Sequence, residues 1–503
     1  MKRRFTNNLL LLTISLVLLA IGSLEIQAST IKVPSDRQTI QLAISAALDG
    51  DSVLVSPGTY TERIDFLGKG ITVQSESGPL VTSINGTGLG SVVTFNAGES
   101  SSAKLIGFTI QKGLGLDGGG IFIRFASPQI INNIIKDNTA SSGGGVDIVG
   151  GSPLLQSNII SNNQAGSGGG PGGGGIHVSG GASARIIDNL ISENVISNSV
   201  GGGIAITGAD ELLIQGNIIR NNRSLRQGGG IYINDDSPTI ISDNLILENE
   251  AGVGLGGISD GGGVYWLMPN SPNRYKIINN TIVNNDADRG SGVFADGFDA
   301  QTEFANNVVV GKRGRNAFYC GSFNDLNLPV IKFNNVYVPR GSTYGGICPD
   351  QTGINSNISS DPLFRDKTKG DYRLGPGSPC LDSGASVVPG LPNADADGNP
   401  RIVDGNGDGV DVVDIGAYEK QAPVITNASI EGKNVIVMGT NFDGGSVILM
   451  NAAKQKTRYD DQNPTTILIG KKLRNKIDPG QTVNLQVRDS DGALSPEFSF
   501  TRP

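Results

Sequence analysis

A glycine cluster followed by an apolar-x-apolar triplet occurs seven times between Gly118 and Ala295. The first apolar residues of successive copies are 25 to 33 residues apart. A second motif, Ile-Ile-x-Asn-x-Ile or a close variant, recurs with a similar period. Its asparagines are Asn133, Asn158, Asn189, Asn217, Asn244, Asn280, Asn307 and Asn335. A fixed period in this range is typical of a solenoid, in which stacked repeats bury a common core.

Each repeat holds short alternating apolar runs bounded by Gly, Asn, Ser and Asp, which is the pattern of strands. Strands of successive coils would pair in parallel, ~4.8 Å apart. Ile121 and Ile123 would then point inward and Phe122 outward, and the asparagines would stack as a hydrogen-bonded ladder. The sequence therefore predicts an all-β chain built on a right-handed parallel β-helix. The regular Ile/Val pairs disfavour the alternative of a disordered glycine-rich chain.

The composition divides the chain into four segments. Residues 1–28 have a basic start and a short apolar run, which predicts a secretory signal and no membrane span after its cleavage, with an uncleaved anchor as the alternative. Residues 29–360 would form the β-helix, with an amphipathic helix from Thr39 to Leu48 capping its open end. Residues 361–420 are an Asp/Gly-rich C-terminal region of the β-helix. Residues 423–503 have the turn spacing of a small β-sandwich.

The net charge limits the partners. The chain carries 39 basic and 47 acidic residues, a formal charge of −8, and loss of residues 1–28 would take it to −10 because they hold three basic residues and one acidic residue. Such an acidic surface disfavours nucleic acid and anionic membranes as partners.

The cysteines are compatible with export. Cys320 and Cys348 are 28 residues apart, one coil length, so stacking would bring their Cα atoms to ~5 Å and allow a disulfide. Cys380 is left over, and we expect it to be buried and inert.

Several segments resemble known families. Residues 39–60, with Gly50-Asp51-x-Val53-x-Val55-x-Pro57-Gly58-Thr59-Tyr60, resemble the N-terminus of pectin-lyase-like right-handed β-helix proteins. The motifs Asp361-Pro362-Leu363-Phe364, Asp371-Tyr372-Arg373-Leu374 and Asp414-Ile415-Gly416-Ala417-Tyr418-Glu419 resemble the C-terminal region of bacterial exported "choice-of-anchor" β-helix proteins. Residues 423–500, with Gly439-Thr440-Asn441-Phe442, resemble an IPT/TIG immunoglobulin-like domain. The resemblance implies a secreted or cell-surface bacterial protein, and its functions range over polysaccharide lyases, hydrolases, epimerases and adhesins.

The middle residues of the triplets should face solvent and form an outward column. Asp147 and His177 would be neighbours in it, and a carboxylate beside an imidazole suits general acid/base catalysis. Aromatic and polar residues on the same face would bind a sugar chain as substrate: Phe122, Arg124, Tyr232, Asn234 and Tyr265. The alternative is that these are ordinary surface residues. The acidic clusters of lyases and hydrolases of this fold are missing from the regular coils.

Oxygen ligands at alternate positions, with a glycine at the sixth, occur in the Asp404–Asp411 segment and resemble the start of a calcium loop. The expected ligands of a structural calcium ion are Asp404, Asn406, Asp408, Asp411 and Asp414. The alternative is an Asp/Gly-rich turn whose carboxylates cap backbone amides.

Three functions follow from this sequence. The favoured one is an exported β-helix protein that binds polysaccharide or a cell-surface partner along the outward strand face. The second is a polysaccharide-active enzyme, a lyase or a hydrolase. The third is a structural surface stalk.

Overall fold

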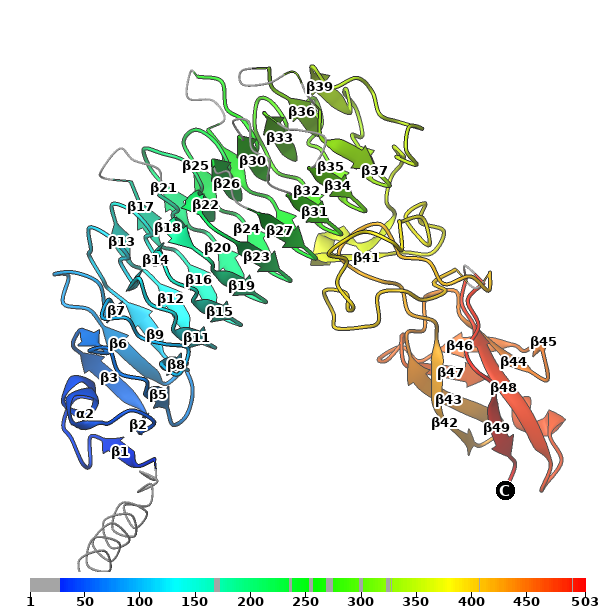
Figure 1. Cartoon of the computed structure of the whole chain (residues 1–503). Helices are drawn as coiled ribbons and strands as arrows, with labels where there is room; N and C mark the ends of the chain where they lie inside the picture. Colours follow the sequence, from blue (N-terminus) through cyan, green and yellow to red (C-terminus); the bar gives the residue numbers. More distant parts are fainter. Residues whose placement is uncertain are drawn as a thin grey trace, which may run out of the picture.

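A computed structural model describes residues 28–503, apart from 167–171, 235–237, 253–256, 268–274, 298–301, 323–325, 327, 407 and 491. The predicted signal segment therefore lies outside the described residues except for Ala28. The chain forms one long curved column of stacked coils, with a smaller strand-rich part beside its far end (Figure 1). Among the described residues, no helix is both long and apolar enough to cross a membrane.

Three long parallel sheets run along the column. Sheet A has 12 strands: β1 (Thr30–Val33), β2 (Ser52–Val55), β5 (Thr72–Ser75), β8 (Lys104–Ile106), β11 (Gln129–Ile131), β15 (Leu154–Gln156), β19 (Arg185–Ile187), β23 (Leu212–Gln215), β27 (Thr239–Ser242), β31 (Lys276–Ile278), β34 (Glu303–Ala305) and β37 (Val330–Lys332). Sheet B has 11: β3 (Gly58–Thr61), β6 (Thr82–Asn85), β9 (Thr109–Gln111), β12 (Ile134–Lys136), β16 (Ile159–Ser161), β20 (Leu190–Ser192), β24 (Ile218–Arg220), β28 (Leu245–Leu247), β32 (Thr281–Val283), β35 (Val308–Val310) and β38 (Asn335–Tyr337).

Sheet C, which carries the predicted outward column, also has 11 strands: β4 (Ile64–Asp65), β7 (Val93–Phe95), β10 (Ile121–Arg124), β14 (Val146–Val149), β18 (Ile176–Ala182), β22 (Ile204–Ala209), β26 (Ile231–Asn234), β30 (Val264–Leu267), β33 (Val293–Asp296), β36 (Phe318–Cys320) and β39 (Tyr344–Gly346). A short sheet D joins β13 (Thr139–Ala140), β17 (Gln164–Ala165), β21 (Val195–Ile196), β25 (Arg223–Ser224) and β29 (Glu250–Ala251). The predicted parallel β-helix is confirmed.

Inward positions of the three long sheets build one continuous core. Ile121 and Ile123 are fully buried, as are Ile130 and Ile135 in the same coil. Because inward residues alternate with outward ones along each strand, every coil presents the same apolar interior to its neighbours. The glycine clusters let coils approach closely: a Cβ at Gly119 would lie 2.5 Å from the Gly144 carbonyl oxygen, so no side chain fits there.

Asparagine ladders hold the corners, as predicted. Each ladder asparagine receives hydrogen bonds from the backbone N–H and side-chain amide of the preceding one; Asn189 donates both to Asn217 Oδ1, at 2.9 and 3.0 Å. The prediction that Asn335 is the last member of the ladder is wrong. Asn334 takes this place, and Phe333 before it has the left-handed backbone (φ 53°) that precedes each ladder asparagine.

A second ladder, five residues further on, escaped the sequence analysis. It consists of Asn138, Asn163, Asn194, Asn222, Asn249 and Asn285. Its members are buried like those of the first ladder. The signal for it was a second asparagine at a constant offset within each repeat.

A helix, α2 (Ile40–Ala46), lies at the N-terminal end of the column and contacts β1, β2 and β4 (Figure 1). Thr39 caps it by accepting a hydrogen bond from the Leu42 N–H, and the helix buries Ile40, Ala43 and Ile44. It is shorter than the expected Thr39–Leu48 range. Its role as a cap stays a prediction.

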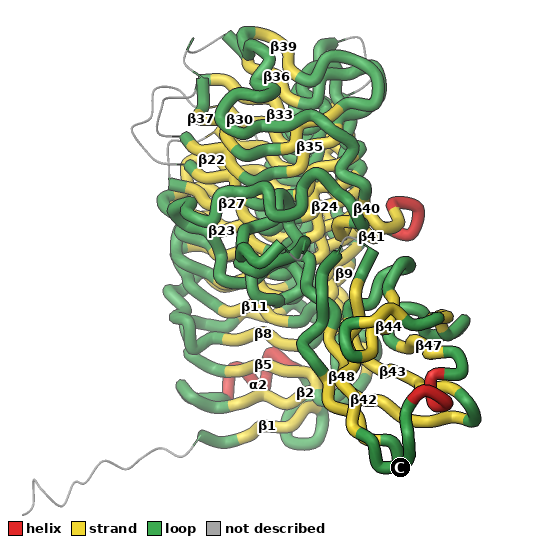
Figure 2. Tube along the Cα trace, turned by 90° about the vertical axis from the view of Figure 1, so that its right-hand side faces the viewer, coloured by secondary structure: helices red, strands yellow, loops and turns green. Residues whose placement is uncertain are grey.

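Residues 361–420 pack against the outer faces of sheets A and B. They contain a small antiparallel sheet, β40 (Phe364–Asp366) and β41 (Asp371–Leu374), and a short 3-10 helix, η1 (Lys367–Lys369). Cys380 and Ile415 pack with Val283 and Val308 of sheet B. Figure 2 shows this segment beside the column. The region is therefore bound to the β-helix by an apolar interface of its own.

The final part of the chain forms two four-stranded antiparallel sheets. One contains β42 (Val424–Glu431), β43 (Asn434–Thr440), β47 (Ile467–Gly470) and β46 (Thr457–Tyr459). The other contains β45 (Ala453–Lys454), β44 (Val447–Met450), β48 (Thr482–Arg488) and β49 (Phe498–Thr501), and the 3-10 helix η2 (Leu473–Lys476) follows β47. Val437 of the first sheet and Leu485 of the second belong to one core. The immunoglobulin-like assignment stays a prediction.

A disulfide joins Cys320 and Cys348, with Cα atoms 5.2 Å apart. Cys348 lies two residues beyond Gly346, the strand partner of Cys320 in the next coil. Cys380 is a buried free thiol, and burial raises its pKa to about 12.

Candidate functional site

The outward column of sheet C has the predicted register. Phe122 pairs with Asp147, Asp147 with His177, His177 with Ala205, and Tyr232 with Tyr265 in neighbouring strands. Ala205 pairs with Tyr232, Tyr265 with Phe294, and Phe294 with Tyr319. From Phe122 to Tyr232 is four strand spacings, about 19 Å. The residues expected to bind substrate therefore form two separate groups, Phe122 with Arg124 and Tyr232 with Asn234 and Tyr265.

The expected exposure of this column is wrong for most of its length. Asp147, His177, Tyr232 and Tyr265 are all at most 8% exposed, although their strands point them away from the β-helix core. Side chains of the adjoining turns pack over the column: Val200 shares a cluster with Ala205 and Tyr232. The outward face of sheet C is thus a second, partly covered layer, and Arg124 remains exposed at its N-terminal end.

A hydrogen-bond chain runs through the polar part of the column. His177 Nδ1 lies 2.8 Å from Asp147 Oδ1, and His177 Nε2 lies 3.0 Å from Thr207 Oγ1. A carboxylate on one ring nitrogen fixes the orientation of the imidazole, and the hydroxyl occupies the other nitrogen. Asp147 and His177 are therefore brought together as predicted. Thr207, two residues beyond the column on β22, was not predicted.

Asp117 shares the electrostatic surroundings of this chain. Burial raises the pKa of Asp117, the negative charge of Asp147 raises it further, and His177 and Arg124 oppose the shift. Two carboxyl groups and one imidazole therefore lie close together here. A carboxyl group with a raised pKa beside a fixed imidazole is a combination that enzymes use for proton transfer.

The aromatic part of the column is a stack of parallel rings. The centroids of Tyr232 and Tyr265 are 5.1 Å apart, those of Tyr265 and Phe294 5.1 Å, and those of Phe294 and Tyr319 5.5 Å, with interplanar angles of 4° to 10°. A ring between two others has both faces covered, so the Tyr265 ring cannot stack on a sugar as the sequence analysis expected. These rings can offer a ligand their edges and the tyrosine hydroxyls instead.

A cavity of about 620 Å³ opens beside the ring stack. The Arg289 guanidinium lies over the rings of Phe294 and Tyr319, 5.2 and 5.3 Å from their centroids, and forms two hydrogen bonds to Asp260. The cavity is lined by Gln227, Tyr232, Asp260, Tyr265, Leu267, Arg289, Phe294, Asp296, Gly321 and Ser322. A groove with aromatic edges on one wall and charged and amide groups on another fits a polar, multi-hydroxyl ligand.

The polar wall of this cavity comes from residues that the sequence analysis missed. Gln227, Asp260 and Arg289 each stand immediately before a glycine cluster and pair with one another along the column. Asp117 and Ser142 occupy the same position in earlier coils and also pair. The signal was therefore present, one residue before each Gly-rich corner.

The five expected calcium ligands do not gather at one point. Asp404 accepts hydrogen bonds from the backbone N–H groups of Asp408 and Gly409, and Asn406 Oδ1 accepts one from Asp408. Asp408 and Asp411 are exposed, whereas Asp414 is fully buried. The loop geometry is that of a turn capped by its own side chains.

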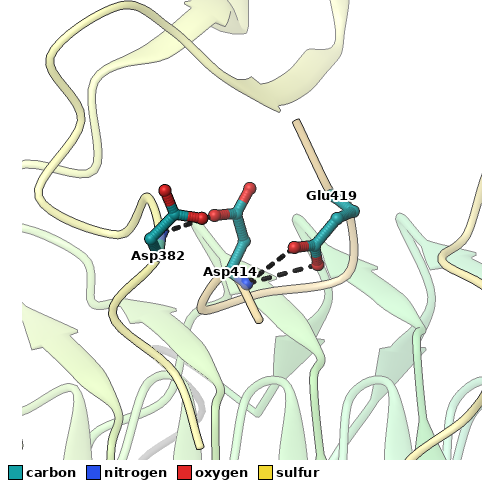
Figure 3. A group of neighbouring side chains, drawn as sticks. All are labelled: Asp382, Asp414 and Glu419. Atoms are coloured by element: carbon teal, nitrogen blue, oxygen red, sulfur yellow. Dashed lines mark hydrogen bonds between the residues drawn. The ribbon is translucent and has the colours of Figure 1, made fainter. Parts of the chain in front are cut away.

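Asp414 instead belongs to a group with Asp382 and Glu419, whose ligand oxygens all lie within 4.8 Å of one another (Figure 3). The Asp382 N–H donates to Asp414 Oδ1 at 2.7 Å, and the Asp414 N–H donates to Glu419 Oε1 at 3.0 Å. Burial raises the pKa of Asp414 to about 7 and that of Glu419 to about 10. Such shifts favour protonated carboxyl groups, which can remain neutral in the interior.

A family model described as the right handed beta helix region matches residues 91–260 and 170–331. This match establishes the right-handed β-helix for the regular array of coils. No curated protein sequence matches the chain.

Two solved structures show a limited similarity to the chain. One is a mutant of the PL6-family alginate lyase AlyGC, with 16% identity and a TM-score of 0.36 over 73% of this chain and 60% of the lyase chain. The other is a mutant pectin methylesterase in complex with a hexasaccharide, with 10% identity and a TM-score of 0.29 over 73% of this chain and 99% of the esterase chain. This chain therefore spans less than two thirds of the alginate lyase chain.

Proposed function

We propose that the chain is an exported, pectin-lyase-like β-helix protein that binds polysaccharide along the outward face of sheet C. The cavity beside the ring stack is the observation that carries the proposal. It offers tyrosine hydroxyls, an amide and a guanidinium–carboxylate pair in one groove, which is the donor and acceptor set that sugar hydroxyls require. The rings whose edges line one wall are held rigidly by one another, so little ordering would be needed on binding.

The binding test uses Tyr232→Phe, which keeps the ring in the stack and removes the hydroxyl at the groove. The matched control is Tyr60→Phe on sheet B, whose hydroxyl donates to the Ser56 carbonyl away from the groove. Retention on immobilised pectate, alginate, chondroitin and xylan is measured for all three proteins. We expect the groove variant to bind one of these glycans about five- to tenfold more weakly, the value of one lost hydrogen bond, and the control to bind normally. Equal binding by both variants would remove the groove from the proposal.

A polysaccharide-active enzyme is the second candidate, and the Asp147–His177–Thr207 chain is the observation that favours it. Asp147 would orient His177, and His177 would move a proton at Nε2 once Thr207 releases it. The assay follows unsaturated products and reducing ends from the same glycans. Activity that disappears in His177→Ala and Asp147→Ala but survives in Tyr60→Phe would support catalysis. Silence on all substrates, together with glycan retention, would leave binding as the function; silence in both assays would favour a structural stalk.

We also propose a structural calcium ion in the exposed loop that begins at Asp404, held by Asp404, Asn406, Asp408 and Asp411 once the capping bonds are exchanged for metal bonds. Asp414 is left out of this ligand set because it is fully buried and grouped with Asp382 and Glu419. Oxygen donors of this type suit calcium, and its role would be to order the loop. Calcium titration should raise the melting temperature of the wild-type protein and not that of Asp404→Ala. An unchanged melting temperature on adding calcium or a chelator would end this proposal.

A further inference from the structure

Basic residues gather at one end of the two C-terminal sheets. Residues 431–434, 453–458 and 471–476 hold eight basic residues and one acidic residue, Glu431. With Arg502 the set is Lys433, Lys454, Lys456, Arg458, Lys471, Lys472, Arg474, Lys476 and Arg502, here called the cationic end. The six lysines and Arg458 are exposed.

Hydrogen bonds between the segments show that these residues are neighbours in space. The Lys471 N–H donates to the Lys456 carbonyl at 2.9 Å, and the Arg474 N–H donates to the Lys433 carbonyl at 3.3 Å. The Lys476 ammonium reaches Gln455 Oε1 at 2.9 Å, between Lys454 and Lys456 in sequence. These bonds bring the three segments together, and Arg502 joins them through its bonds to the Arg474 and Ile477 carbonyls, so the nine cations lie in one part of the C-terminal sheets.

The distribution of charge sets this surface apart from the rest of the chain. Residues 423–503 carry ten basic and eight acidic residues, a net charge of +2. Since the whole chain has a net charge of −8, residues 1–422 have a net charge of −10. Exposed cations of the β-helix often stand beside acids, as in Arg223–Glu250 and Lys136–Asp137. Within the described parts of the chain, no residue of the cationic end forms an ion pair within 4.0 Å.

The arginines and lysines of this end have different roles. Arg474 donates to the Gly432 carbonyl at 2.9 Å and Arg502 to the Ile477 carbonyl at 2.5 Å, so these two guanidinium groups fasten segments together. Lys476 bonds Gln455, and the other five lysines are exposed and can reach a partner. An ammonium on a flexible stem is a point charge without a fixed fork, so it suits an anion whose charged groups repeat along a flexible chain.

The side chains around the cationic end favour a polysaccharide over the other polyanions. Membrane-surface binding adds inserted aromatic or aliphatic side chains to the basic ones, and single-stranded nucleic acid is held by exposed stacking rings. The exposed large apolar residues among the described part of the C-terminal sheets are Val424, Met438 and Leu494, and all three lie outside the cation-bearing segments. Tyr459 follows Arg458, but it packs against the core of the two sheets.

We propose that the cationic end binds an acidic polysaccharide, a glycan with carboxylate or sulfate groups on successive sugars. The site is separate from the groove on sheet C and does not depend on it. The surface would retain the protein on an anionic glycan layer, while the acidic β-helix is repelled by it and extends away.

The test compares polygalacturonate with its methyl-esterified form, which has the same backbone without the charges. The variant Lys456→Gln/Lys471→Gln/Lys472→Gln is made in the full chain, and the matched control removes three exposed cations of the β-helix, Lys112→Gln/Arg185→Gln/Arg226→Gln. Each lysine near an anionic surface is worth about fivefold in affinity, so we expect the first variant to bind polygalacturonate roughly 100-fold more weakly at low salt. The control variant should bind like the wild type. Wild-type affinity should fall as salt rises, with a shallower dependence in the first variant.

The other outcomes overturn the proposal. Equal loss of binding in the two triple variants would show that only total charge matters. Binding to the esterified glycan that matches binding to polygalacturonate would remove the role of charge. Tighter binding to phosphatidylserine vesicles than to polygalacturonate would assign the surface to membranes, and salt-sensitive dimers of the wild type that the first variant cannot form would assign it to the acidic β-helix of a second copy. Tyr232→Phe leaves the cationic end intact, and the triple lysine variant leaves the groove intact. Failure of the groove proposal can therefore be told apart from failure of this one.

Discussion

Replacing one ladder asparagine should open the β-helix locally, and Asn217→Ala is the sharpest case. Asn217 is fully buried in the middle of the column. Its Oδ1 accepts from the backbone N–H and the side-chain amide of Asn189, and its Nδ2 donates to the Ile186 and Gln215 carbonyls and to Asn244 Oδ1. One small side chain therefore joins three successive coils.

The magnitude follows from what the alanine leaves unpaired. The Asn189 backbone N–H loses Asn217 Oδ1, and an unsatisfied buried donor costs about 1–3 kcal/mol. The lost amide donations add about 1 kcal/mol each for the groups with no other partner. We expect a destabilisation of about 3–5 kcal/mol, concentrated in the coils on either side. Since each 1.4 kcal/mol is tenfold, the amide of Asn189 should exchange its hydrogen roughly 100- to 4,000-fold faster.

Hydrogen exchange with mass spectrometry measures this opening coil by coil, which suits a solenoid in which each coil contacts mainly its neighbours. The control is Asn221→Gly, an exposed asparagine four residues on whose left-handed backbone (φ 54°) glycine adopts easily. Exchange near Asn189 that is no faster in Asn217→Ala than in the control would refute the claim that the ladder holds the coils together.

Three further predictions concern the attachments of the column. Asp243→Ala removes the closer of the two carboxylates that pair with the Arg401 guanidinium, which is 1% exposed, and leaves only Glu419 at 3.4 Å. The change should cost about 3 kcal/mol, measured as earlier proteolysis within residues 361–420, whereas Asp137→Asn at the exposed pair with Lys136 should change little. Burial raises the pKa of Asp243 to about 7, above its unfolded value, so its stabilising contribution is complete below pH ~4 and is lost as the pH rises through ~7; the melting temperature should fall over this window in the wild type and less in Asp243→Asn. Replacing Cys320 and Cys348 together by alanine opens a loop with a sequence separation of 28 and should cost about 3–4 kcal/mol by calorimetry, while Cys380→Ala, at a thiol in no disulfide, tests the loss of packing and of the bond from Asn335; a double variant as stable as the wild type would contradict the constraint.

The fold could be predicted because the repeat fixes it at every level. The period, the alternating Ile/Val pairs and the corner asparagines all require the same stacked coil, and the structure has it. The error at Asn335 is instructive: two asparagines adjoin in that coil, and only the backbone of Phe333 decides which one enters the ladder. The sequence pattern alone does not specify the φ angle of Phe333.

The site could be predicted only in part. Register placed Asp147 beside His177, because strand pairing is periodic. The cover over the column was not predictable in this way, since it comes from corner residues such as Val200 that vary from coil to coil. The stacking of Tyr232 on Tyr265 also follows from the register, and it has the opposite consequence from the one expected, because two rings in successive coils cover each other before any sugar can.

The column divides at Ala205 into a polar part and an aromatic part, and the two differ in what a ligand can reach. Both nitrogens of His177 already have partners, and its side chain is 10% exposed. Catalysis there would require Thr207 to move away and a substrate to enter the covered layer. The aromatic part needs no such rearrangement, because the cavity already lies along the ring edges between Tyr232 and Phe294. Polysaccharide binding in the aromatic part therefore requires less rearrangement of this structure than catalysis does. Catalysis by His177 would require movement of the side chains that cover it.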